Sequence, residues 1–215
     1  MKLFKIVLVL LVVLLNLVFV PPSSAEPKTP KYATNSDYIE VTQSLNTLLK
    51  AKETPAEAEK YTPEELDNKI ADLEFQKYTL ETGINWGQCR NETGKTLAVY
   101  GPNPKKSKST YDKTLYFLGA GQTTDPEWDC DGIYIPSDAV TNLTTDGQTL
   151  GAVAVKIVDG TQLVVKTNAD TGVLELNPLP AKIFKSGEVN WFIPNVSQAS
   201  IDTRVPNASL QDQTD

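Results

Sequence analysis

The feature that most constrains the fold is a change in hydrophobic spacing near Gly83. Before this residue, apolar side chains recur at every third or fourth position, which is typical of amphipathic helices. After it, short runs of β-branched and aromatic residues are separated by turn-forming sequences, which is typical of strands. A chain with this division is predicted to adopt an α+β fold.

Two helices are predicted within residues 36–82, where they form a helical hairpin. The first follows the N-cap residue Asn35 and ends before Pro55. The second begins at residues 62–65, which combine an N-cap, a first-turn proline and a capping glutamate, and it ends at Gly83. Because a lone helix pair buries too little apolar area, this hairpin is expected to pack on the domain that follows. A partner-binding helical arm is the alternative.

Residues 83–194 are predicted to form an antiparallel β domain, either a sandwich or a small barrel. Short turns at residues 92–94, 159–160 and 170–172 lie between strand-like runs. Such connections favour antiparallel neighbours. The predicted strands are residues 86–90, 96–101, 114–119, 132–136, 150–158, 162–167, 173–176 and 189–193.

The first 25 residues are predicted to be an export signal that is removed after Ala25. Lys2 and Lys5 give a positive start, residues 6–20 are almost entirely apolar, and small residues precede the cleavage site. A helix of that apolar run spans only about 22 Å, against roughly 30 Å for the hydrocarbon core of a membrane. An uncleaved anchor is therefore the disfavoured alternative. The mature chain is predicted to be periplasmic or extracellular, with no stable membrane span.

Two flanking segments have little core-forming sequence. Residues 26–35 are proline-rich and polar, which predicts an extended leader. Residues 195–215 contain few large apolar side chains and show no hydrophobic period. They are predicted to form a flexible tail.

The two cysteines, Cys89 and Cys130, are predicted to form one disulfide bond. An exported chain leaves the reducing cytosol, so its cysteines can pair and stay paired. Neither lies in a Cys-x-x-Cys motif, which disfavours a redox-active pair. Closing a loop of this length stabilises a fold by about 4 kcal/mol in the chain-entropy treatment.

The composition excludes several kinds of chemistry. The chain has no histidine, which excludes Ser–His and Cys–His catalysis and histidine-ligated metal sites. Its formal net charge is −7, and removing the signal takes away Lys2 and Lys5 but no acid, which makes the charge −9. This acidic balance disfavours binding to nucleic acid. We therefore expect a binding protein rather than an enzyme.

The richest polar cluster lies between residues 125 and 138. Its acids are spaced partly as in a helix–loop–helix calcium site, but Pro136 interrupts the loop and strand-forming residues follow it. Calcium bound in another geometry is one reading, and an acidic surface loop is the alternative. The same acids could also supply the two carboxylates of a glycan hydrolase. The candidate calcium ligands are Glu127, Asp129, Asp131 and Asp138.

Aromatic and basic side chains suggest a ligand surface. Trp86, Trp128 and Tyr134 are candidate ligand-binding residues, with core packing as the alternative. Residues 105–108 contain three lysines, which form either a solvated loop or a contact for an anionic glycan or a lipid headgroup.

Together these features predict an exported α+β protein that binds an envelope glycan or another protein without catalysis. It consists of a helical hairpin followed by a disulfide-bonded antiparallel β domain. The alternatives are a carboxylate-dependent glycan hydrolase and a calcium-stabilised structural protein of the envelope. The sequence leaves the oligomeric state and the identity of the ligand open.

Overall fold

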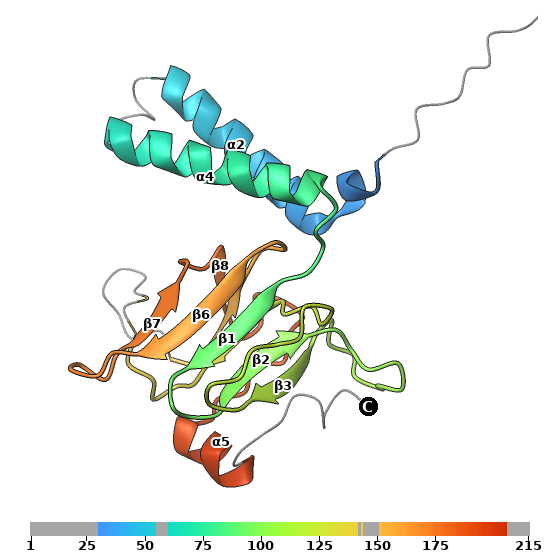
Figure 1. Cartoon of the computed structure of the whole chain (residues 1–215), viewed down its shortest axis with the longest axis vertical. Coiled ribbons are helices and arrows are strands. Elements are labelled where there is room, and N and C mark those ends of the chain that lie inside the picture. Colours follow the sequence, from blue (N-terminus) through green and yellow to red (C-terminus); the bar gives the residue numbers. More distant parts are fainter. Residues whose placement is uncertain (1–29, 55–59, 142, 144–150, 206–215) are drawn as a thin grey trace, which may run out of the picture. The chain divides into compact units, whose positions relative to one another are not determined.

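A computed structural model describes residues 30–54, 60–141, 143 and 151–205 (Figure 1). Every helix and strand described below lies within residues 31–215. The fold is α+β, with helices and two β-sheets. The predicted signal, residues 1–25, lies outside the described residues. The helices are η1 (Lys31–Thr34), α2 (Ser36–Glu53), α4 (Pro63–Glu81) and α5 (Gln198–Arg204).

Helices α2 and α4 begin where the sequence predicts, because both have strong N-terminal caps. The Asn35 side chain accepts hydrogen bonds from the backbone nitrogens of Asp37, at 2.7 Å, and Tyr38, at 3.3 Å. At the start of α4, Thr62 and Glu65 form a reciprocal capping box. Among the described residues, no helix is long and apolar enough to cross a membrane.

The two helices pack against each other along an apolar cluster that contains buried Leu45, Leu66 and Ile70 (Figure 1). Lys52 of α2 also pairs with Asp67 of α4, with Nζ and Oδ1 2.6 Å apart. Both of these side chains are more than half exposed, so the ion pair contributes little to stability. The apolar contacts are therefore the main stabilisation between the two helices.

The strands form two sheets. The five-stranded sheet has the order β3-β2-β4-β5-β8 and is antiparallel throughout. The three-stranded sheet has the order β1-β6-β7, and its β6 and β7 strands are antiparallel. The strands are β1 (Gln88–Glu92), β2 (Leu97–Gly101), β3 (Thr114–Leu118), β4 (Gly132–Ile135), β5 (Val153–Lys156), β6 (Gln162–Thr167), β7 (Leu174–Asn177) and β8 (Lys182–Lys185).

Strand β1 departs from the predicted antiparallel arrangement. It pairs in parallel with β6, and Gln88 lies opposite Gln162. Residues 92–94, which were expected to join two neighbouring strands, instead carry the chain from one sheet to the other. A parallel pair needs a long connection, which strands β2 to β5 provide. The prediction of a purely antiparallel β domain is therefore wrong at this pair.

A second difference concerns the last strand. Residues 189–193 are not a strand, although Trp191 forms an isolated bridge with Lys113. The last strand is β8, which the sequence pattern did not predict. It lies at the edge of the five-stranded sheet, and its lysine ends suit an edge strand because they discourage pairing with other chains.

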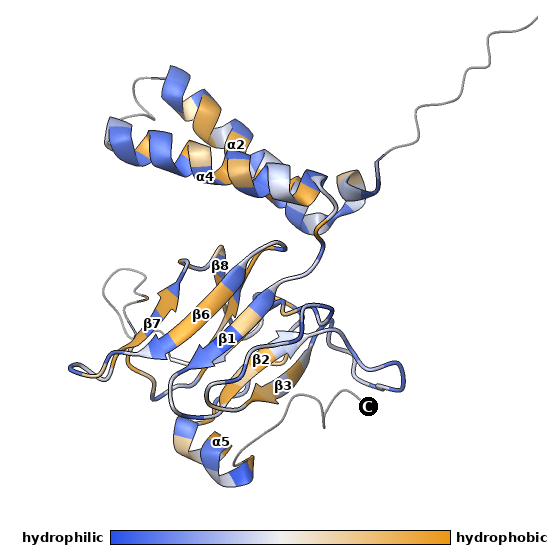
Figure 2. Ribbon diagram, in the orientation of Figure 1, coloured by the Kyte–Doolittle hydropathy of each residue, from blue (hydrophilic) through white to orange (hydrophobic). Residues whose placement is uncertain are grey.

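Apolar clusters cover both faces of the five-stranded sheet. One cluster joins the two sheets and contains buried side chains from β1 to β7. Successive strand residues point to opposite faces, so Tyr100 and Tyr134 belong to a second cluster, together with Trp191 and Ile201. Figure 2 shows the resulting apolar stretches along strands such as β2 and β6.

The second face is covered by the segment that follows β8. Helix α5 begins after the N-cap Ser197, and Ile201 on this helix is buried. The Tyr134 hydroxyl lies 2.7 Å from the carbonyl oxygen of Pro194 and bonds to it. Residues 195–205 are thus part of the fold rather than of a flexible tail, because a sheet with apolar residues on both faces must be covered on both. Residues 206–215 lie outside the described residues.

The predicted disulfide is confirmed. Cys89 in β1 is bonded to Cys130, two residues before β4, with Cα atoms 5.9 Å apart. Both cysteines are fully buried in the cluster between the sheets. The bond therefore links the two sheets through their common core.

Candidate functional site

The three aromatic residues singled out by the sequence do not form one surface. Trp128 is half-buried and packs edge-on against Tyr116, with ring centroids 5.1 Å apart. Tyr134 is fully buried, and it belongs to the opposite face of the five-stranded sheet from the cluster that Trp128 contacts. Trp86 is half-buried, and its carbonyl oxygen accepts a hydrogen bond from the backbone of Gly160 at 2.8 Å.

The four candidate calcium ligands have separate surroundings. Glu127 and Asp138 are exposed, and Asp138 accepts a hydrogen bond from the backbone nitrogen of Gln198 at 2.8 Å. Asp129 and Asp131 are half-buried. In the part of the chain that the structure describes, no group of three or more acids or cysteines is placed to hold a metal ion.

Asp129 and Asp131 do interact with each other electrostatically. Burial raises the pKa of Asp129, although a hydrogen bond from the Gly87 backbone, at 2.9 Å, opposes that rise. Burial and the neighbouring Asp129 charge raise the pKa of Asp131 to about 7, although Asp131 is paired with Lys113. Its Oδ2 atom is buried without a hydrogen-bond partner. Neither of the two cavities described below is lined by these acids.

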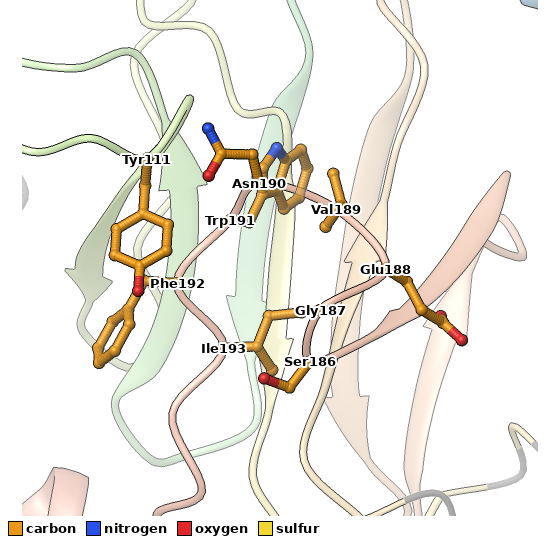
Figure 3. A pocket seen from close by; sticks show the side chains of 9 residues that line it. All are labelled: Tyr111, Ser186, Gly187, Glu188, Val189, Asn190, Trp191, Phe192 and Ile193. Carbon is orange, nitrogen blue, oxygen red and sulfur yellow. The ribbon is translucent and has the colours of Figure 1, made fainter.

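An aromatic cavity of about 560 Å³ lies between Tyr111 and the segment that follows β8 (Figure 3). The Tyr111 and Phe192 side chains are 39% and 48% exposed, with ring centroids 5.4 Å apart. Figure 3 shows these rings side by side at one end of the cavity and Glu188 at the other. The cavity therefore combines exposed aromatic faces with polar groups. Its lining residues are Tyr111 and residues 186–193.

Hydrogen bonds hold the two segments of this cavity together. The backbone nitrogen of Asp112 donates to the carbonyl oxygen of Asn190 at 2.9 Å. The Asn190 side-chain nitrogen donates to the Thr110 carbonyl oxygen at 3.1 Å and to the Asp112 carboxylate at 2.9 Å. Asn190 therefore fixes the chain on both sides of Tyr111.

Each exposed ring also has a fixed backbone. Asn103 donates from its side chain to the carbonyl oxygen of Tyr111 at 2.7 Å. The hydroxyl of buried Tyr100 donates to the carbonyl oxygen of Phe192 at 2.8 Å. Burial raises the pKa of Tyr100, so this hydroxyl keeps its proton and remains a donor. The aromatic pair is thus held in place before any ligand arrives.

Residues 105–108, here called the lysine loop, precede Tyr111 in the chain. Lys105, Lys106 and Lys108 are exposed and form no ion pair with the described residues. The bond from Asn103 to Tyr111 closes the base of this loop at one residue of the aromatic pair. In contrast, the next lysine in the chain, Lys113, is paired with Asp131.

One feature of the sequence could have predicted part of this site. Trp191 and Phe192 are adjacent, and adjacent residues in extended chain point to opposite sides. Trp191 is only 7% exposed, because it packs against Tyr100 with ring centroids 4.7 Å apart. Phe192 must therefore face outward. Tyr111 had no comparable signal, since its position depends on contacts with residues about 80 positions away.

A second cavity, of about 880 Å³, lies between the helix pair and the β-sheets. Its apolar wall includes Val41 and Leu73 from the helices and Ile157 from the segment after β5. The loop between β7 and β8 borders the same cavity with Leu179, which is 73% exposed.

Comparison of the chain with protein-family models, with curated proteins and with solved structures finds no match. Its function is therefore inferred from the aromatic cavity and the groups around it.

Proposed function

We propose that this chain is an exported, non-catalytic protein that binds an envelope glycan at the Tyr111–Phe192 pair. In this proposal the helix pair is a hairpin, and the two sheets form a sandwich that presents the site. The observation that carries the proposal is the pair of exposed aromatic rings, which hydrogen bonds fix beside a cavity. The buried disulfide supports export, because such bonds persist in oxidising compartments.

The chemistry of the cavity suits a sugar. A sugar ring has an apolar face of C–H groups, which packs favourably on the electron-rich face of an aromatic ring. Its hydroxyl groups need hydrogen-bond partners at the edge of that contact. The exposed side chains of Ser186, Glu188 and Asn190 lie along the cavity and can supply them.

The lysine loop favours a glycan that carries negative groups. The three positive charges of this loop, which form no ion pair with the described residues, would attract carboxylate or phosphate groups on a ligand bound at the aromatic pair. Because exposed charges are screened by salt, the lysine contribution should weaken as ionic strength rises. Affinity for a neutral glycan should change much less.

Truncation of the aromatic pair tests the proposal. Binding would be measured on an array of neutral oligosaccharides and of oligosaccharides bearing uronate or phosphate groups, followed by calorimetric titration of those that bind. Tyr111→Ala and Phe192→Ala should each weaken binding by about tenfold, because each removes one stacking surface.

Phe75→Ala and Tyr78→Ala are matched controls. Both residues are exposed aromatics, 69% and 64% exposed, but they lie on α4 rather than at the cavity. Their removal should leave binding unchanged. If no glycan on the array binds, or if the control variants weaken binding as much as the cavity variants, glycan binding at this site is refuted.

A carboxylate-dependent glycan hydrolase is the second candidate. The raised pKa values of Asp129 and Asp131 favour it, because a hydrolase needs one carboxyl group that stays protonated. Release of reducing ends from the same oligosaccharides, lost in Asp131→Asn, would support hydrolysis. Glycan binding without such release would support the non-catalytic proposal.

A further inference from the structure

The turn between β5 and β6 connects the β domain to both long helices. The backbone nitrogen of Asp159 donates to the Asp37 carboxylate in α2 at 3.0 Å. The Asn35 side chain donates to the Asp159 carboxylate at 2.9 Å. A side-chain carbon added at Gly160 would lie 2.5 Å from the Thr79 side chain, so the turn also touches α4 closely. We call these contacts between the Asp159–Gly160 turn and the helices the latch.

Asn35 connects the N-terminal cap of α2 with the docking of the helix pair on the β domain. Its side-chain oxygen caps α2 by accepting from the backbone nitrogens of Asp37 and Tyr38. The nitrogen of the same side chain bonds to Asp159. The start of α2 is therefore held against the turn as long as the helix keeps its cap.

The latch places carboxylates close to one another. Asp37 is only 6% exposed, and its carboxylate accepts from Lys156 at 2.6 Å as well as from the turn. The charges of Asp37 and Asp129 repel a charge on Asp159, whereas Lys113 attracts it. These groups come from α2, β5 and the segments that precede β3 and β4.

Several other charges on the helices and on β8 form ion pairs. On α2, Glu40 pairs with Lys156 at 3.0 Å and with Lys182 of β8 at 3.5 Å. On α4, Lys77 pairs with Glu81 at 2.5 Å. Repulsion at Asp159 comes from Asp37 and Asp129, and the charge of Asp159 in turn repels a charge on Asp131.

The apolar contact beside the latch is small. Val41, Leu80 and Val158 form a cluster of three buried residues that joins the helix pair to the β domain. Burial of a few such side chains contributes only a few kcal/mol. The polar contacts can therefore shift the balance between docked and undocked helices.

We propose that the latch is controlled by a proton: the helix pair docks firmly while Asp159 is protonated and loosens when Asp159 is ionised. Loosening would open the second cavity, whose wall is shared by the helices and the β domain. This proposal is independent of the glycan site. It assigns the helix pair a regulated contact rather than a fixed one.

The direction of the effect follows from the surroundings of Asp159. Burial raises its pKa from the ordinary 3.8 to about 6 in the docked state. An undocked Asp159 in water would return to its ordinary value, so docking takes up a proton between these two pH values. Docking is thus strongest in acid, weakens as the pH rises from about 3.8 to about 6, and changes little above that. Because Asp159 is partly exposed, screening by water reduces the effect, and we expect the docking equilibrium constant to change by roughly tenfold between acid and neutral pH.

Amide hydrogen exchange measured by NMR on the chain expressed from its full sequence tests the latch. The Asp159 amide reports docking directly, because it is the donor to Asp37. The Ile133 amide in buried β4 reports global unfolding. After correction for intrinsic exchange rates, protection of Asp159 relative to Ile133 should fall by roughly tenfold between about pH 4.5 and about pH 7.5.

Two variants identify the responsible group. Asp159→Asn cannot ionise, so its relative protection should stay high and independent of pH. Asp170→Asn, in an exposed turn between β6 and β7, should keep the wild-type fall. If Asp159→Asn does not fold, the wild-type profile still tests the proposal, since its fall must end near pH 6. A wild-type profile without any fall, or the same fall in Asp159→Asn, would overturn the proposal.

Discussion

Replacing Asn91 with alanine removes only a small side chain, but it should destabilise the protein strongly. Asn91 is fully buried, and its side-chain nitrogen donates to the carbonyl oxygens of Lys95 and Leu118, both at 2.7 Å. Its side-chain oxygen accepts from the backbone nitrogen of Thr93 at 3.0 Å and from the Thr93 hydroxyl at 2.7 Å. This one side chain therefore shapes the turn that carries the chain from β1 to β2.

The magnitude follows from the groups that lose their partner. A buried carbonyl left without a donor costs about 1–3 kcal/mol. The Leu118 contact is buried and the Lys95 contact is partly buried, so we assign about 2 kcal/mol to the first and about 1 kcal/mol to the second. The free energy of unfolding should therefore fall by about 3 kcal/mol, which at an m-value of about 2 kcal/mol/M lowers the urea midpoint by about 1.5 M.

Asn168→Ala is the matched control for this experiment. Asn168 also organises a turn, accepting from Asp170 and Thr171 and donating to Glu175, but it is only half-buried. Water can replace its hydrogen bonds, so the loss should be below about 1 kcal/mol. Both variants would be unfolded in urea with the disulfide intact. Equal midpoint shifts for the two variants would show that burial does not determine the loss in free energy of unfolding, and would refute this explanation.

Two further predictions concern the C-terminal helix and calcium. Ile201→Ala should lower the free energy of unfolding, measured in urea, by about 2–4 kcal/mol, because Ile201 is buried. Thr203→Ala, at an exposed position of the same helix, should have little effect. Equal effects of the two variants would mean that α5 does not stabilise the sheet. The thermal midpoint should be the same in calcium and in excess chelator, because exposed Glu127 and Asp138 are not grouped with a third ligand among the described residues. A higher midpoint in calcium would instead indicate specific binding to the folded chain and support the calcium-stabilised alternative.

Local signals predicted helices α2 and α4 and the disulfide. The caps at Asn35 and Thr62 act within four residues, so they can be recognised without knowledge of the rest of the fold. The pairing of Cys89 with Cys130 needed only the count of cysteines and the predicted compartment. By contrast, the partner of β1 could not be predicted, because it depends on which of several similar strands completes a sheet.

The candidate site depended even more on distant contacts. The sequence allowed Tyr134 either a ligand surface or the core, and residues 194–196 together with α5 place it in the core. Tyr111 and Phe192 are exposed because Asn103, Asn190 and Tyr100 fix their backbones. Aromatic content can be read from a sequence, but the side of the sheet that becomes covered is decided by the whole chain.

The parallel pairing of β1 sets an order of assembly for a chain that emerges N-terminus first. Gln88 and its partner Gln162 are 74 positions apart, so β2 to β5 emerge before β1 can pair with β6. During this interval Cys89 can already bond to Cys130, which ties β1 to the growing five-stranded sheet while the edge of β1 that pairs with β6 remains open. A product that stops short of β6 would expose this edge to neighbouring chains. Complete emergence of the chain is thus the step that protects it from self-association.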